Sequence, residues 1–250
     1  MIMSGNDRFN AEAAAWDANP DVHRASDGAL QAILAAIPSL PSQNARVLEI
    51  GCGTGLLSLR LAPHVSSILA IDAAEGMIDA LTQKLARPEN DVVKQKIHPL
   101  CVMLEDPEDR RLPSADSSNP DGPREKYDLI TSHLVLHHIA DLAAVLRTMH
   151  GCLRPGGEVA LTDYEDFGPE ARKFHPESKM FGVERHGIDA KWFAGLMTEA
   201  GFVDVDVSPK WTMEKEVERV PGEWGESKPQ GQDLATMGFP FLLCRGKKAA

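Results

Sequence analysis

The sequence predicts an α/β fold in which a mostly parallel β-sheet carries helices on both faces. Between residues 46 and 163, short apolar runs typical of buried strands alternate with longer segments of helical pattern. Strands that alternate with helices are joined by right-handed crossovers, which makes them parallel. The first of these strands runs into the motif Glu49-Ile50-Gly51-Cys52-Gly53-Thr54-Gly55, where three glycines precede a helix.

The N-terminal part, residues 1–45, is expected to form a helical lid ahead of the sheet. Residues 11–37 have a helical composition that is interrupted at Asn19-Pro20, because the residue before a proline disfavours helix. Residues 38–44 are then a linker. Trp16 lies just before the break, and it either covers a bound ligand or packs on the sheet edge.

The first strand, Arg46–Ile50, ends in the glycine turn. Without Cβ atoms, the backbone can turn sharply there and a ligand can come close. The helix that begins at Leu56 directs its free N–H groups at the turn, which favours an anion. A dinucleotide-binding turn needs its third glycine at position 56, so Leu56 argues against a nicotinamide-dependent dehydrogenase.

The second strand, Ser67–Asp72, ends in an acid about 20 residues beyond the glycine turn, which suits a carboxylate that accepts both hydroxyls of a ribose. The alternative is a helix cap for Ala73 onward. On the following helix, Met77 packs either on an adenine face or in the core. After the third strand, 98–104, an acid could accept from an adenine amino group, or the acidic loop is simply solvated. Asp106 is preferred for this role, with Glu105 as the alternative.

Residues 110–124 form an exposed loop before the fourth strand, 126–132. A histidine-rich segment, 133–139, follows that strand, and the helix 141–152 comes next and ends at Pro155-Gly156. The fifth strand is 158–163. Near the C-terminus, the sequence predicts a helix at 191–200, an alternating strand at 202–207 and a last apolar strand at 238–244. The connection 208–237 is longer than a hairpin needs.

Taken together, the glycine turn, Tyr127-Asp128-Leu129-Ile130, His137-His138-Ile139 and Leu153-Arg154-Pro155-Gly156-Gly157 resemble motifs of class I S-adenosylmethionine (SAM) dependent methyltransferases. They are most similar to the small-molecule enzymes of the ubiquinone/menaquinone-biosynthesis type. The resemblance covers residues 46–163 and implies a Rossmann-like sheet of seven strands with an antiparallel C-terminal edge hairpin. Residues 46–250 are then the SAM-binding methyltransferase domain.

This resemblance implies that SAM binds with its carboxylate near the glycine turn and its ribose on Asp72. The residues expected to bind the cofactor are Glu49, Gly51, Cys52, Gly53, Gly55, Asp72, Ala73, Met77, Glu105, Asp106, Ser132 and His133.

The implied reaction is transfer of a methyl group to oxygen, nitrogen, sulfur or carbon of a small organic molecule by in-line displacement. A base is needed only if the nucleophile must lose a proton, and the candidates are His133 and, second, His186. Residues 164–190 are expected to form part of a substrate pocket or lid. The residues expected to bind the substrate are Trp16, His137, Tyr164, Phe181 and His186. A SAM-binding regulatory or scaffold protein without acceptor turnover is the alternative function.

His133 and His137 could share one helical face, like half of a metal site, but no third ligand accompanies them, so no metal is predicted. A net charge of −11 disfavours nucleic acid as a partner. No stretch is long enough to span a membrane. The four cysteines form no C-x-x-C pair, as is usual in a reducing compartment. The expected location is therefore the cytoplasm, with the nucleus left open.

Overall fold

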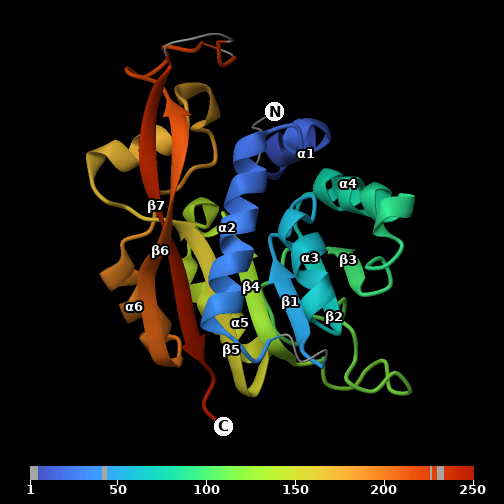
Figure 1. Cartoon of the computed structure of the whole chain (residues 1–250). Coiled ribbons are helices and arrows are strands. Elements are labelled where there is room, and N and C mark those ends of the chain that lie inside the picture. The colour runs from blue at the N-terminus through green and yellow to red at the C-terminus, as the bar shows by residue number, and fades with distance from the viewer. Residues whose placement is uncertain (1–4, 41–43, 226, 230–233) are drawn as a thin grey trace.

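The computed structural model describes residues 5–40, 44–225, 227–229 and 234–250, and it confirms the predicted α/β fold (Figure 1). In the part described, seven strands form one sheet in the order β3-β2-β1-β4-β5-β7-β6. Strands β1 to β5 pair in parallel, and β7 lies antiparallel between β5 and β6. The strands are β1 Arg46–Ile50, β2 Ser67–Asp72, β3 Ile97–Cys101, β4 Tyr127–His133, β5 Leu153–Tyr164, β6 Val203–Val217 and β7 Ala235–Lys247.

The helices begin where the sequence offers a capping side chain or a proline. Asn19 accepts from the backbone N–H of Asp21 at the start of α2, and Pro20 occupies its first turn. Asp141 and Asp189 cap α5 and α6 in the same way. The α-helices are α1 Gly5–Trp16, α2 Pro20–Ala36, α3 Leu56–Leu61, α4 Glu75–Leu85, α5 Leu142–Cys152 and α6 Ala190–Glu199.

The core has two layers, one on each face of the sheet. Successive residues of a strand point to opposite faces, so Val47 packs with α2, α3 and α4 while Leu48 packs with α5 and α6. The same alternation occurs at Leu129 and Ile130 in β4. Both faces of the parallel strands are therefore covered, which explains why these strands are apolar throughout.

The edge hairpin is longer than the sequence indicated. The predicted connection 208–237 is in large part strand: β6 runs to Val217 and β7 begins at Ala235, and the two pair along this length. The hairpin rises past the other strands in Figure 1. Periodicity failed here because Pro209 and Lys210 interrupt the alternation at a register shift. Residues 226 and 230–233 of that connection, like 41–43 of the predicted linker and 1–4 of the predicted lid, lie outside the described residues.

Two other boundaries also differ from the prediction. The third strand ends at Cys101 rather than Leu104, and Val102 and Leu104 leave the sheet to join the core beside α5. The fifth strand begins at Leu153, so the Pro155-Gly156 segment lies within β5 as an irregular start of the strand rather than before it.

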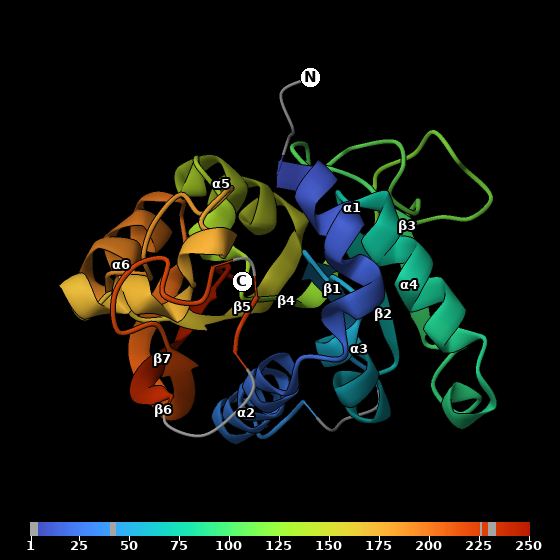
Figure 2. The ribbon, with the colours of Figure 1, turned by 90° about the horizontal axis from the view of Figure 1, so that it is seen from above.

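The N-terminal helices take two different positions. Helix α2 packs across β6 and β7 and against α3. Helix α1 packs on α4, and from above it lies over the ends of β1 and β2 (Figure 2). The predicted break at Asn19-Pro20 is confirmed, and it allows the two helices to cover different parts of the sheet. No helix within the described ranges is both long and apolar enough to cross a bilayer.

The packing of α2 on the hairpin can be tested at Gly28. A Cβ added there would meet Trp211 Nε1 at 2.5 Å, and the Trp211 ring is held in a stack with Phe241. We expect Gly28→Ala to lower the free energy of unfolding by about 1–3 kcal/mol, because the indole must move. Gly195→Ala in α6 is the matched control, because nothing lies within 4 Å of its added Cβ.

The control should be stabilised by about 0.5–1 kcal/mol through its higher helix propensity. Urea unfolding of both variants checks this. Equal effects of the two substitutions would contradict the proposed packing of Gly28 on Trp211.

Candidate active site

The glycine turn has the geometry that the sequence predicted. Gly51, Gly53 and Gly55 have φ angles of 71°, 53° and 79°, a region that other residues rarely adopt. A Cβ on Gly51 would meet Val135 at 2.5 Å, whereas nothing lies within 4 Å of a Cβ on Gly53. The turn therefore needs all three glycines, and at Gly53 it leaves open space that a ligand can enter.

Asp72 is bound to this turn. Its carboxylate accepts from the backbone N–H of Gly53 and from that of Ala74, each at 2.8 Å. Burial raises the pKa of the Asp72 carboxyl, and these backbone N–H groups partly offset the effect. The contact with Ala74 is the helix-cap arrangement, and the contact with Gly53 places the acid beside the open side of the turn. Binding of a ribose by Asp72 stays a prediction.

Glu49 and Cys52 lie on the inner side of the turn. Glu49 is 1% exposed and accepts a hydrogen bond from the Ser58 hydroxyl in α3. Burial, with the Asp72 carboxylate nearby, raises the pKa of Glu49 to about 8. Cys52 is also buried, which raises the pKa of its thiol well above the usual value. Both buried side chains therefore pack beneath the glycine turn.

The loop after α1 is hydrogen-bonded to the outer side of the glycine turn. Asp17 accepts from the Thr54 hydroxyl at 2.6 Å and forms an ion pair with Lys84 at 2.5 Å. Lys84 Nζ also donates to the carbonyl of Thr54. This network joins the loop after α1, the glycine turn and α4. No sequence pattern predicted it.

Two of the residues predicted to bind cofactor or substrate meet between α1 and α4. Met77 is 2% exposed and packs in a small cluster with Ala74 and Ala13, and Trp16 covers this cluster from α1. Glu105 and Asp106, in contrast, are exposed in the loop after Val102, and Asp106 accepts from the backbone N–H of Glu108. Among the described residues, no side-chain hydrogen bond holds either acid near the turn, so their adenine role stays a prediction.

The end of β4 brings two predicted residues to the sheet edge. Ser132 donates to the carbonyl of Ile50 at 2.8 Å, which joins β4 to the first strand's end. His133 shares a 2.8 Å hydrogen bond between its Nδ1 and Thr162 Oγ1, and its Nε2 is buried without a partner. Burial lowers the pKa of His133 to about 4, so the ring is neutral near pH 7.

The expectation that His133 and His137 share a helical face is wrong. His133 is the last residue of β4, and Leu134 then turns the chain with a φ of 56°. His137 belongs to the separate short helix η3, Leu136–His138. The left-handed residue between strand and helix is the physical reason, and such a conformation leaves little signal in the sequence.

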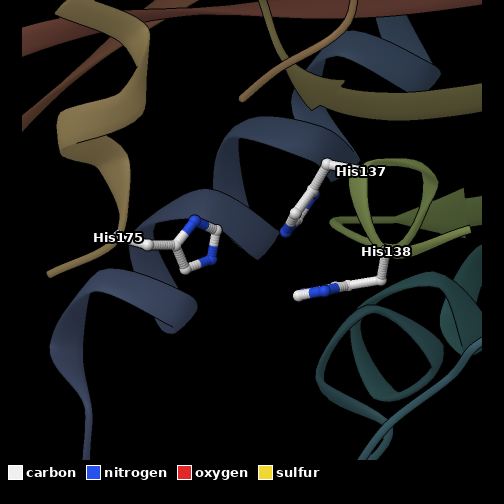
Figure 3. A group of neighbouring side chains, drawn as sticks. All are labelled: His137, His138 and His175. Atoms are coloured by element: carbon white, nitrogen blue, oxygen red, sulfur yellow. The ribbon is translucent and has the colours of Figure 1, made fainter. Parts of the chain in front are cut away.

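A third histidine lies beside His137 and His138, a grouping that the sequence did not predict, while the absence of a metal stays a prediction. Figure 3 shows His175 facing His137 and His138 from the far side of a small space. One ring nitrogen of each residue lies within 4.8 Å of those of the other two. His175 follows η4, Pro169–Phe174, and sequence reasoning missed it because 37 positions separate it from His138.

The remaining substrate candidates lie at different depths. Tyr164 is fully buried and stacks on Phe174 with ring centroids 4.0 Å apart, while Phe181 is 53% exposed. His186 has a buried Nδ1 without a partner. Arg185, which lies in the expected pocket segment, donates to the carbonyls of Leu136, Ile139 and Ala140 and so fixes η3 against residues 164–190.

The pH dependence of stability tests the burial of Glu49. The unfolded chain ionises this group near its ordinary pKa of 4.5 and the folded protein near 8. The folded state therefore holds the proton more tightly, so the stability linked to Glu49 is complete below about pH 4.5 and is lost as the pH rises to about 8. Glu49→Gln cannot ionise, and its amide oxygen can still accept from Ser58.

We expect Glu49→Gln to gain stability relative to wild type by up to about 1.4 kcal/mol per pH unit across that window. Urea unfolding of both proteins without cofactor, at about pH 5, pH 7 and pH 9, measures this difference. A difference that does not change with pH would contradict the assignment.

Comparison with known proteins places this geometry in a family. Residues 22–207 match the model of a methyltransferase domain. An uncharacterized methyltransferase of Schizosaccharomyces pombe is 28% identical over 143 residues, 56% of this chain and 47% of the relative. An uncharacterized methyltransferase of Mycobacterium tuberculosis is 30% identical over 149 residues, 60% of each chain. The match thus spans about half to three fifths of these relatives.

A solved structure of a SAM-dependent methyltransferase from Thermotoga maritima superposes with a TM-score of 0.60 at 20% identity, covering 96% of this chain and 98% of that one. The likeness confirms the fold with its Rossmann-like sheet. The open Gly53 and the adjacent Asp72 also fit S-adenosylmethionine, the cofactor that this domain implies. The family model matches residues 22–207, which is most of this chain. The chain therefore belongs to the family of methyltransferase domains.

Proposed function

We propose that the protein transfers a methyl group from S-adenosylmethionine to a small organic molecule. The closure of the site by α1 is the observation that supports a small acceptor. Arg8 Nη1 donates to the carbonyl of Lys179 at 2.9 Å and to that of Phe181. Glu12 of α1 forms an ion pair with Lys179 at 2.5 Å. A helix fastened in this way over the described part of the site favours a small acceptor over a macromolecule.

These contacts support the predicted division into a lid and a methyltransferase domain. We infer that residues 1–45 act as a lid and that residues 46–250 hold the cofactor and the acceptor. The lid is fastened at two places, to the glycine turn through Asp17 and to residues 164–190 through Arg8 and Glu12. Polar contacts of this kind are weak individually, so α1 can open for exchange of ligands while α2 stays packed on α3, β6 and β7.

On the cofactor side, S-adenosylmethionine supplies a methyl carbon already activated by its sulfonium. The open Gly53 admits its amino-acid end, and Asp72 accepts from its ribose hydroxyls. Met77 and Trp16 exclude water on the side of α4. The protein then contributes proximity and a dry site, which are the main requirements for a displacement at an activated carbon.

On the acceptor side, we infer that His133 touches the substrate. Its Nε2 has no partner among the described residues, and Thr162 fixes the ring through Nδ1. A neutral imidazole can accept a hydrogen bond from the acceptor and orient its nucleophile. The motif residues His137 to Ile139 further favour the small-molecule branch that resembles ubiquinone/menaquinone-biosynthesis enzymes.

Cofactor binding is tested by titrating the protein with S-adenosylhomocysteine in a calorimeter. Asp72→Ala removes a carboxylate with two possible hydrogen bonds to the ribose, so we expect affinity to fall by about 10- to 100-fold. Asp79→Ala is the control, because it removes the same charge from an exposed position in α4. Equal affinities for Asp72→Ala and wild type would contradict the ribose role.

Closure by α1 is tested with Glu12→Gln, which removes the charge that pairs with Arg8 and Lys179. We expect S-adenosylhomocysteine to dissociate about 3- to 10-fold faster, because partly buried ion pairs contribute on the order of 1 kcal/mol. Stopped-flow displacement measures the rate, and Glu89→Gln at an exposed position is the control.

The acceptor class is tested with radiolabelled cofactor. Incubation with fractionated small metabolites should give labelled small products, whereas protein and nucleic-acid fractions should stay unlabelled. Label found only in a macromolecular fraction would overturn the proposal of a small acceptor.

A further inference from the structure

We propose that His137, His138 and His175 bind a divalent transition-metal ion, with zinc as the ion that suits them best. The site is separate from the glycine turn. It joins η3, which follows β4, to the segment after η4, and one ring nitrogen from each histidine lies within 4.8 Å of the others (Figure 3).

Two of the rings are already oriented as metal ligands are. The Nδ1 atom of His137 lies 2.8 Å from Asp163 Oδ1 and 2.9 Å from Oδ2, so this nitrogen carries the proton that the carboxylate accepts. The Nδ1 atom of His138 lies 2.7 Å from the carbonyl of Gly182. In both residues Nε2 therefore has its lone pair free. A carboxylate or carbonyl behind a ligating histidine is the usual outer shell of a metal site.

Unpartnered buried nitrogens are the second observation. His137 is 1% exposed and its Nε2 has no hydrogen-bond partner, and the buried Nδ1 of His175 also lacks one. A buried polar atom without a partner costs on the order of 1–3 kcal/mol. A metal ion among the three rings would bind the Nε2 of His137 directly. It would thereby offset the cost of burying this nitrogen without a partner.

The donor set limits the choice of ion. Imidazole nitrogens suit zinc, copper, iron and nickel, whereas calcium and magnesium prefer oxygen. Three histidines leave a fourth position open to water or to a heteroatom of another molecule, which is the arrangement of catalytic rather than structural zinc. Zinc–nitrogen bonds of about 2.0 Å place tetrahedral ligands roughly 3.3 Å apart, so the ring nitrogens, which lie within 4.8 Å of one another, must approach by at most about 1.5 Å.

The charges around the cluster permit a cation. Asp163 is fully buried against His137 and supplies one negative charge. Two nearby cations are already paired, Arg8 with Glu12 and Lys215 with Asp21, and a third, Arg185, is held by backbone carbonyls. An ion here would also tie residues 164–190 to η3, next to the contacts that Arg185 makes with the same helix.

The test uses the full-length protein after treatment with a chelator and its removal. Titration with Co²⁺ alone should give one equivalent bound, with the visible absorption of a four-coordinate ion, and Zn²⁺ should displace it. His175→Gln lies in a loop after η4, so it should fold and should weaken Co²⁺ binding by at least about 100-fold. Asp163→Asn should weaken it by about 10- to 100-fold, because it acts through His137.

His98→Ala, at an exposed histidine on β3, is the control and should bind Co²⁺ like wild type. Circular dichroism verifies that each variant folds. The proposal is overturned if the wild type binds no Co²⁺ or Zn²⁺ at up to about millimolar concentration. It is also overturned if folded His175→Gln binds as tightly as His98→Ala. Neither result bears on the proposed methyl transfer, which is measured separately with radiolabelled cofactor.

Discussion

The structure depends on the way the glycine turn is fastened to the second strand. The backbone N–H groups of Gly51 and Cys52 both donate to the carbonyl of Ile71, and that of Gly53 donates to Asp72. Three consecutive donors thus point at the end of one strand, which only a left-handed path through the glycines allows. This constraint fixes where α3 begins, keeps Glu49 inside and leaves Gly53 open. The cofactor side of the site follows from these few hydrogen bonds.

The sequence predicted the features that local patterns carry. Apolar runs identified the five parallel strands, Asp141 marked the start of α5, and Asn19-Pro20 marked the break between α1 and α2, because capping and burial act within a few residues. The glycine motif located the turn for the same reason. Asp72 was found through its spacing from that motif, although its hydrogen bond with Gly53 depends on the pairing of two strands.

Features that arise from chain folding could not be predicted this way. His175 meets His137 only because residues 164–190 fold back over the end of β4, where Arg185 fastens them to η3. Asp17 reaches Thr54 because α1 crosses above the sheet. Such contacts join segments whose separation in sequence has no period, so neither hydrophobic pattern nor residue spacing signals them. The extended hairpin was missed because Pro209 interrupts the alternation of β6 at a register shift.

The polar groups at the glycine turn differ in kind from those that follow β4. The path of the chain at the end of β4 causes this difference. On the cofactor side the polar groups are backbone N–H groups and Asp72, which suit a ligand with hydroxyl and charged groups. On the other side the chain turns at Leu134, whose left-handed conformation costs on the order of 1 kcal/mol, and presents histidines instead. His133 stays with the sheet through Thr162, whereas His137 faces away toward His175. One strained residue thereby separates His133, for which we propose contact with the acceptor, from His137 and His138, which we propose as metal ligands.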